Sequence, residues 1–286
     1  MENLFTTFPA VWQLDIGTPI NQAILYVSKN YGGVFAFIKA LLSGFTLGIQ
    51  YIVEMIPWWL TVIGVGVWGW RTNGRPARGL LFSCLLLSIG FLGLWQLMLE
   101  TISLVIASVL ISLCIGFPIG ILVSGSDKAN QFARPVLDAM QTMPTFVYLI
   151  PAVMFFGLGL VPAVLATTIY AVPPVIRLTS HAIRQVDAEV VEAARSFGST
   201  WSQTLVKVQI PQALPTIMAG VNQTIMMAVA MVVTCAMIGA KGLGMEVLIG
   251  INRLEIGRGF TAGVAIVIVA IIIDRLTQGV SAAQKQ

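Results

Sequence analysis

Four residues near the middle of the chain, Glu192, Ala193, Ala194 and Gly198, stand in a polar segment between two long apolar blocks. Glu192 offers a surface carboxylate, and the two alanines are small enough to let a partner approach the backbone closely. The segment 180–214 therefore predicts an exposed helical hairpin that docks a soluble partner. The alternative is a solvated loop made of ordinary helix formers, because exposed amphipathic helices are common.

Capping signals define the first helix of this hairpin. Asp187 is a good N-cap, and Glu189 then lies in the first turn, where the helix dipole favours a negative charge. Gly198 can adopt the left-handed conformation that ends a helix. These signals predict a short helix over 188–197.

A second set of signals defines the helix that follows. Thr200 and Gln203 have the spacing of a capping box, which satisfies backbone donors at a helix start. The pattern predicts a helix over 201–209. Pro211 is expected to end it.

Four side chains in the next apolar stretch are candidates for lining a translocation path: Asn222, Gln223, Met226 and Met227. Polar residues inside a spanning helix often face a cavity or another helix. Because neighbours on a helix are about 100° apart, either Asn222 with Met226 or Gln223 with Met227 would face such a path. The alternative is hydrogen bonding between helices, at about 0.6 kcal/mol each.

The sequence offers little material for catalysis. His181 is the only histidine, and the three cysteines are widely spaced inside apolar blocks. No metal site, disulfide framework or Ser/His/Asp set is expected. The glycines and lysine of GAKGLG (239–244) lack the spacing of a phosphate-binding loop. We therefore predict no enzyme, no cofactor in this chain and no nucleic-acid binding.

The composition indicates a membrane protein. The chain has 286 residues, 57% of them hydrophobic and 10% charged, whereas about 25% of residues are charged in a typical soluble domain. A spanning helix needs about 20 mostly apolar residues. The predicted fold is an all-α polytopic membrane protein with about seven transmembrane helices. The expected spans are 57–71, 79–97, 100–124, 139–157, 161–179, 215–239 and 259–277.

The ends of the chain are assigned separately. Residues 1–56 are expected to form a tail with an amphipathic helix in the membrane interface, 57–279 the transmembrane domain and 280–286 a cytoplasmic tail. The alternative is an eighth span over about 33–53. The first residues lack a basic region followed by an apolar core, so no cleavable signal peptide is expected.

Basic residues predict the orientation. They gather in the turn RTNGRPAR (71–78), in SDKANQFARP (126–135) and in the segment 180–214, which fall on one side of a seven-span topology. Short loops rich in Lys and Arg remain in the cytoplasm. We expect a multi-pass membrane protein with its N-terminus outside and its C-terminus inside. An eighth span would bring the N-terminus inside.

The central hairpin resembles the EAA loop of ABC importer permeases. The shared order is Glu-Ala-Ala, three residues, glycine, nine residues, and then two apolar residues, one residue apart, before a proline. The matching positions here are Glu192, Ala193, Ala194, Gly198, Val208, Ile210 and Pro211. The family more often has Ile and Leu at the two apolar positions.

Other segments resemble the glycine betaine, proline betaine and choline branch of this family. They are LDAMQTMPTFVYLIP (137–151), AVPPVIRLT (171–179), the run 194–228 and IVIVAIIIDRLTQ (266–278). The resemblance covers roughly residues 80–278. It implies the type I permease fold, a location in the bacterial inner membrane, and an osmoprotectant with a quaternary ammonium group as cargo.

The resemblance also implies partners. Importers of this family combine two permease subunits, here expected to be a homodimer in membrane lipid, with a periplasmic or lipid-anchored substrate-binding protein. Separate ATPase subunits bind ATP and Mg, and the EAA loop sits in a cleft of the ATPase. The seven positions of the motif are then the ATPase-coupling residues.

Two alternatives remain open at this point. A permease of the same family could carry an amino acid such as methionine. A secondary transporter would instead use an ion gradient and often carries acidic residues within the membrane. Asp274 is the only acid within the last apolar run.

Overall fold

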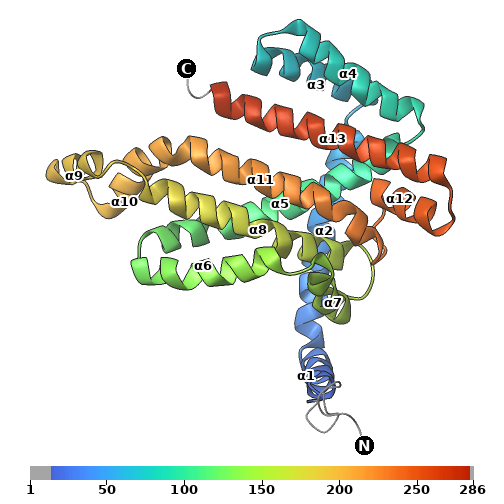
Figure 1. The fold of residues 1–286 in the computed structure, drawn as a ribbon, viewed down its shortest axis with the longest axis horizontal. Coiled ribbons are helices and arrows are strands. Elements are labelled where there is room, and N and C mark those ends of the chain that lie inside the picture. Colours follow the sequence, from blue (N-terminus) through green and yellow to red (C-terminus); the bar gives the residue numbers. More distant parts are fainter. Residues whose placement is uncertain (1–13, 284–286) are drawn as a thin grey trace, which may run out of the picture.

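A computed structural model describes residues 14–283, and this part of the chain consists of helices joined by short turns (Figure 1). The predicted absence of a signal peptide concerns the first residues and lies outside the described range, as does the end of the predicted tail 280–286. The all-helical fold class is confirmed for the described residues.

The helices follow one another closely along the chain. In order they are α1 (Gly17–Asn30), α2 (Gly32–Met55), α3 (Trp58–Asn73), α4 (Pro76–Phe91), α5 (Trp95–Ser124), α6 (Asp127–Thr142), α7 (Thr145–Phe156), α8 (Leu160–Arg184), α9 (Ala188–Ser196), α10 (Trp201–Thr204), the π-helical turn η2 (Leu205–Gln209), α11 (Ile210–Ala236), α12 (Leu243–Asn252) and α13 (Ile256–Ala283).

Five helices of the described chain are long and apolar enough to cross a membrane: α2, α5, α8, the continuous stretch Trp201–Ala236 and α13. The predicted spans 57–71 and 79–97 correspond to α3 and α4, which have 16 residues each. A helix of this length is shorter than the roughly 20 residues of a straight span. The second of these ends earlier than predicted, because Gly93, at a φ of 73°, turns the chain into α5.

The prediction of one helix over 139–157 is wrong. This part of the chain is divided between α6 and α7, which meet at an angle of 92°. Met143 is extended, with φ −65° and ψ 135°, as expected for a residue before a proline. Pro144 then caps α7. The apolar run by itself predicts one helix here, whereas the proline separates two. The predicted separation of the spans 139–157 and 161–179 is confirmed, because α7 ends at Phe156 and α8 begins at Leu160.

The prediction that Pro211 ends a helix is also wrong. The helix that begins at Trp201 continues through η2 into α11 without a break. In η2 the Ile210 N–H donates to the Leu205 carbonyl, five residues earlier. Proline in a regular helix clashes with the carbonyl four residues before it. The wider π turn accommodates Pro211 at the start of α11, and such turns often occur at functional sites.

The N-terminal helices are set across the rest of the molecule. Figure 1 shows α2 running across α8, α11 and α13 rather than along them, with α1 projecting beyond the bundle. Its 24 residues give α2 the length of a span. The assignment of residues 1–56 to an interfacial tail, and the division into a transmembrane domain and tails, stay predictions.

Helices α5 and α8 form the centre of the bundle. Gly116 and Gly120 of α5 lie against Val175 and Thr179 of α8, which leaves no room for a side chain between the two backbones. Nearby, the Ser112 hydroxyl donates to the Thr168 carbonyl across the interface, at 3.2 Å. Small residues and hydroxyls of this kind are the usual means of packing helices within a membrane.

Candidate coupling site on the helical hairpin

The first helix of the hairpin, α9, is capped as predicted. The Asp187 carboxylate accepts a hydrogen bond from the Glu189 N–H at 3.0 Å. Gly198 has a φ of 82°, the left-handed conformation that ends the helix. Figure 1 shows α9 at one end of the molecule, beyond the ends of the long helices. Glu192 and Ala193 are exposed there, and Ala194 is half-buried.

A dense set of hydrogen bonds fixes the turn between the two helices. The capping box is formed: the Gln203 N–H donates to the Thr200 hydroxyl at 3.4 Å, and the Thr200 N–H donates to the Gln203 side chain at 2.9 Å. The Ser199 hydroxyl donates to the Ala194 carbonyl at 2.6 Å and lies 2.7 Å from the Thr204 hydroxyl. The hairpin is therefore a preformed unit rather than a loose loop.

An apolar cluster attaches the hairpin to the bundle. Leu205 and Ile210 of the second helix pack with Ile183 of α8, Ile217 of α11 and Phe117 of α5. Val208 is half-buried, whereas Pro211 is exposed. Ile210 of the motif thus packs on the bundle, while Glu192 and Ala193 are exposed on α9.

The hairpin also exposes large apolar side chains that the sequence reasoning did not single out. Phe197 is 93% exposed next to the turn glycine, and Trp201 is 56% and Val206 60% exposed. Exposed apolar side chains grouped on a polar segment are typical of contact surfaces between proteins. The sequence signal was present, because Phe197 directly precedes Gly198 in an otherwise polar turn.

A cleft of about 340 Å³ lies between the hairpin and the bundle. Glu192 and Arg195 of α9 face it, together with Trp201 and Arg184. The cleft combines charges of both signs with an aromatic face. No group of three or more potential metal ligands lies among the described residues.

The predicted path residues do not form one group. Asn222 is half-buried, and its amide donates to Asp274 of α13 at 2.9 Å while its carbonyl accepts from Thr277 at 2.6 Å. This is the geometry of the alternative, hydrogen bonding between helices. Gln223 is exposed on α11, and Met226 and Met227 are half-buried.

More than half of the chain matches one known protein family. Residues 112–285, from within α5 through the hairpin and α13, match the family described as "binding-protein-dependent transport system inner membrane component". The chain belongs to this family. It is therefore an inner-membrane permease component of a transport system, and five of its described helices are long and apolar enough to cross the membrane.

Three relatives support the assignment over most of the chain. The glycine betaine transport system permease protein OpuAB of Bacillus subtilis is 45% identical over 93% of this chain and 94% of its own length. The glycine betaine/carnitine transport permease protein GbuB of Listeria monocytogenes is 48% identical, over 87% and 89%. The glycine betaine/proline betaine transport system permease protein ProW of Escherichia coli is 44% identical, over 91% and 73%.

The fold is shared with a solved permease. An inward-facing structure of the MetNI methionine ABC transporter has a chain that matches with a TM-score of 0.60 at 24% identity. The match covers 68% of this chain and 96% of that chain. This likeness confirms the predicted permease fold.

Substitutions at Asn222 and Gln223 are expected to affect different properties of the protein, stability and uptake respectively. Asn222→Leu removes two hydrogen bonds between α11 and α13, worth about 1–2 kcal/mol together, so the melting temperature should fall by a few degrees. Gln223→Ala should leave the melting temperature unchanged and alter substrate uptake. Thermal unfolding and uptake by reconstituted protein are the measurements. A loss of uptake in a fully stable Asn222→Leu protein would instead place Asn222 on the path.

Proposed function

We propose that this chain is the permease of an ATP-driven importer for an osmoprotectant with a quaternary ammonium group, with glycine betaine as its main cargo and proline betaine or choline as others. The observation that carries the proposal is the set of three relatives, 44–48% identical over most of this chain, whose names all specify glycine betaine. The alternative cargo, methionine, is supported only by the similarity of fold to the methionine transporter.

The proposed driving force is ATP hydrolysis by a partner ATPase that binds ATP and Mg. The ATPase is proposed to dock on the hairpin. The contact includes Glu192, Ala193, Ala194 and Gly198, and Phe197 lies at the exposed tip. The contact continues into the long helix α11 through Val208 in η2 and through Ile210 and Pro211 at the start of α11. The preformed turn and the apolar attachment to α5, α8 and α11 support this role. A rigid hairpin transmits a displacement that a loose loop would absorb.

Two further partners belong to the proposal. A substrate-binding protein delivers cargo to the external surface, and a second copy of this chain completes the path. Gln223 and Ala230 lie on an exposed stripe of α11, which fits a face that borders such a path. Gln223, with Met226 and Met227 beside it, is the candidate lining.

Transport driven by an ion gradient is not part of this proposal. The family is one of binding-protein-dependent transport. Asp274, the acid that suggested it, is 20% exposed and accepts hydrogen bonds from Asn222 and Gln278. The carboxylate therefore takes part in contacts between and within helices.

Reconstitution tests the proposed function. Vesicles that contain the permease, its ATPase and its binding protein should accumulate radiolabelled glycine betaine only when ATP is present on the ATPase side. Ionophores should have no effect, and excess unlabelled proline betaine should compete, whereas methionine should not. Uptake without ATP that ionophores abolish, or uptake of methionine in place of glycine betaine, would contradict the proposal.

A further inference from the structure

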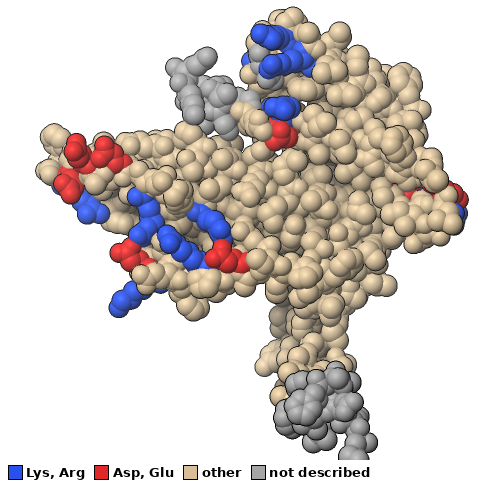
Figure 2. Space-filling model, in the orientation of Figure 1, with Lys and Arg blue, Asp and Glu red and all other residues tan. Residues whose placement is uncertain are grey.

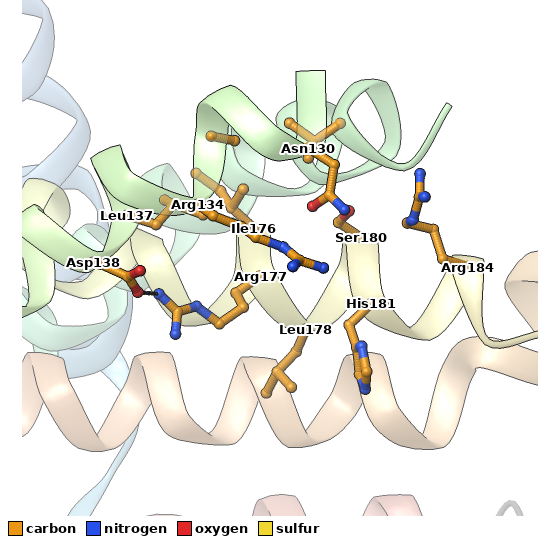
Figure 3. A pocket seen from close by; sticks show the side chains of 12 residues that line it. Asn130, Arg134, Leu137, Asp138, Ile176, Arg177, Leu178, Ser180, His181 and Arg184 are labelled. Carbon is orange, nitrogen blue, oxygen red and sulfur yellow. Dashed lines mark hydrogen bonds and ion pairs between the residues drawn. The ribbon is translucent and has the colours of Figure 1, made fainter. Parts of the chain in front are cut away.

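A basic cavity of about 420 Å³ lies between α6 and α8. Three arginines line it, Arg134 from α6 and Arg177 and Arg184 from α8 (Figure 3). Figure 2 shows basic side chains gathered on this part of the surface, near the end that carries the hairpin. No step in the proposed coupling uses this cavity.

The charges around the cavity leave an excess of positive charge. Arg177 is paired with Asp138, and the dashed line in Figure 3 marks this contact. Arg184 is paired with Asp127 and also donates to the Ser124 carbonyl at 3.1 Å. Arg134 has no ion pair among the described residues. Since two carboxylates face three guanidinium groups, one full positive charge has no counter-charge.

A buried hydroxyl also lacks a partner in this cavity. Ser180 lines the wall formed by α8 and is 3% exposed. Its Oγ has no hydrogen-bond partner among the described residues. Buried polar groups are nearly always hydrogen-bonded, because an unpaired one is unfavourable. Asn130 of α6 and His181 of α8 add further polar groups to the lining. The cavity thus has both charge and unused hydrogen-bonding capacity.

From these features, we infer that the cavity between α6 and α8 binds a phosphate group. Arginine presents a planar fork of N–H donors that matches phosphate oxygens. Arg177 and Arg184 are held in place by carboxylates that each use only part of the fork, and Arg134 is free to close on the ligand. Ser180 and Asn130 supply neutral donors. The phosphate comes either from free inorganic phosphate or from the headgroup of an anionic phospholipid.

The position of the cavity links its ligand to the hairpin. Arg184 lines both this cavity and the cleft beneath α9. A phosphate held by Arg134 and Arg184 joins α6 to the end of α8, three residues before the cap of α9. Bound phosphate therefore stabilises the position from which the hairpin projects.

Binding by the full-length protein tests the inference. Titration calorimetry in a neutral detergent measures inorganic phosphate. Native mass spectrometry from nanodiscs of mixed phosphatidylglycerol and phosphatidylcholine measures retained lipid. Arg134→Ala should weaken whichever ligand binds by about tenfold or more, since hydrogen bonds to charged groups are strong. Ser180→Ala should weaken it about fivefold, and Arg134→Lys, which keeps the charge without the fork, should give an intermediate loss.

Lys128→Ala is the matched control, because it removes one positive charge from the same helix outside the cavity. Loss of phosphate binding in Arg134→Ala without lipid selectivity identifies free phosphate as the ligand. Loss of phosphatidylglycerol retention without phosphate binding identifies the headgroup. If neither ligand binds the unmodified protein, or if Lys128→Ala weakens binding as much as Arg134→Ala, the inference is wrong.

Discussion

Glu192→Lys is expected to abolish ATP-driven uptake while the protein remains folded in the membrane. Glu192 is exposed on α9, and its side chain makes no hydrogen bond or ion pair within the described chain. Exposed substitutions of this kind change stability by less than about 0.5 kcal/mol. At a contact with a partner, reversal of a charge that becomes buried costs about 2–5 kcal/mol, which weakens association by roughly thirtyfold or more.

Co-purification of the ATPase and uptake into vesicles are the two measurements. Lys128→Glu serves as the control, since it reverses one exposed charge on another helix, α6, at a residue that does not line the cleft beneath α9. Glu192→Gln, which keeps the shape and removes the charge, should give a partial loss. Unchanged uptake and ATPase retention in Glu192→Lys would exclude α9 as the coupling contact.

Gly120→Leu is expected to prevent the normal packing of α5 on α8. A Cβ atom on Gly120 would lie 2.7 Å from the Thr179 Cβ and 3.0 Å from the Ile176 carbonyl oxygen. These atoms belong to the backbone and to a stiff β-branched side chain, so neither can move aside cheaply. Overpacking a core costs about 1–3 kcal/mol and sometimes more, and we expect the melting temperature to fall by roughly 5–10 °C.

Thermal unfolding in detergent and the yield of monodisperse protein measure this effect. Gly64→Leu in α3 is the matched control, because a Cβ there meets nothing within 4 Å. The control should unfold near the temperature of the unmodified protein. Equal stability of the two variants would show that α5 and α8 are not held at the close distance described above.

The hairpin could be predicted from the sequence because its signals are local. Asp187, Gly198 and the pair Thr200 and Gln203 each act on backbone groups within three residues, so spacing alone identifies them. All four were confirmed. The break between α6 and α7 carried a signal as well, since Pro144 restricts Met143, but mean hydropathy across the block outweighed it.

Other features depend on distant parts of the chain. Arg134 and Arg177 are far apart in the sequence, and neither stands in a pattern that predicts a shared cavity. Asn222 suggested a path because its side chain is polar, whereas its hydrogen bonds to Asp274 and Thr277 appear only when α11 and α13 are placed side by side. A π turn that accommodates Pro211 within a continuous helix has no clear sequence pattern, so the proline by itself predicts a helix end.

The unbroken run from Trp201 to Ala236 has a mechanical consequence. Its 36 residues form a rod about 54 Å long that begins at the hairpin and reaches the opposite end of the bundle. A tilt of only about 5° at the hairpin end would move the far end by roughly 5 Å, enough to open or seal a passage between helices. Leverage of this kind needs no large rearrangement at the point where force enters.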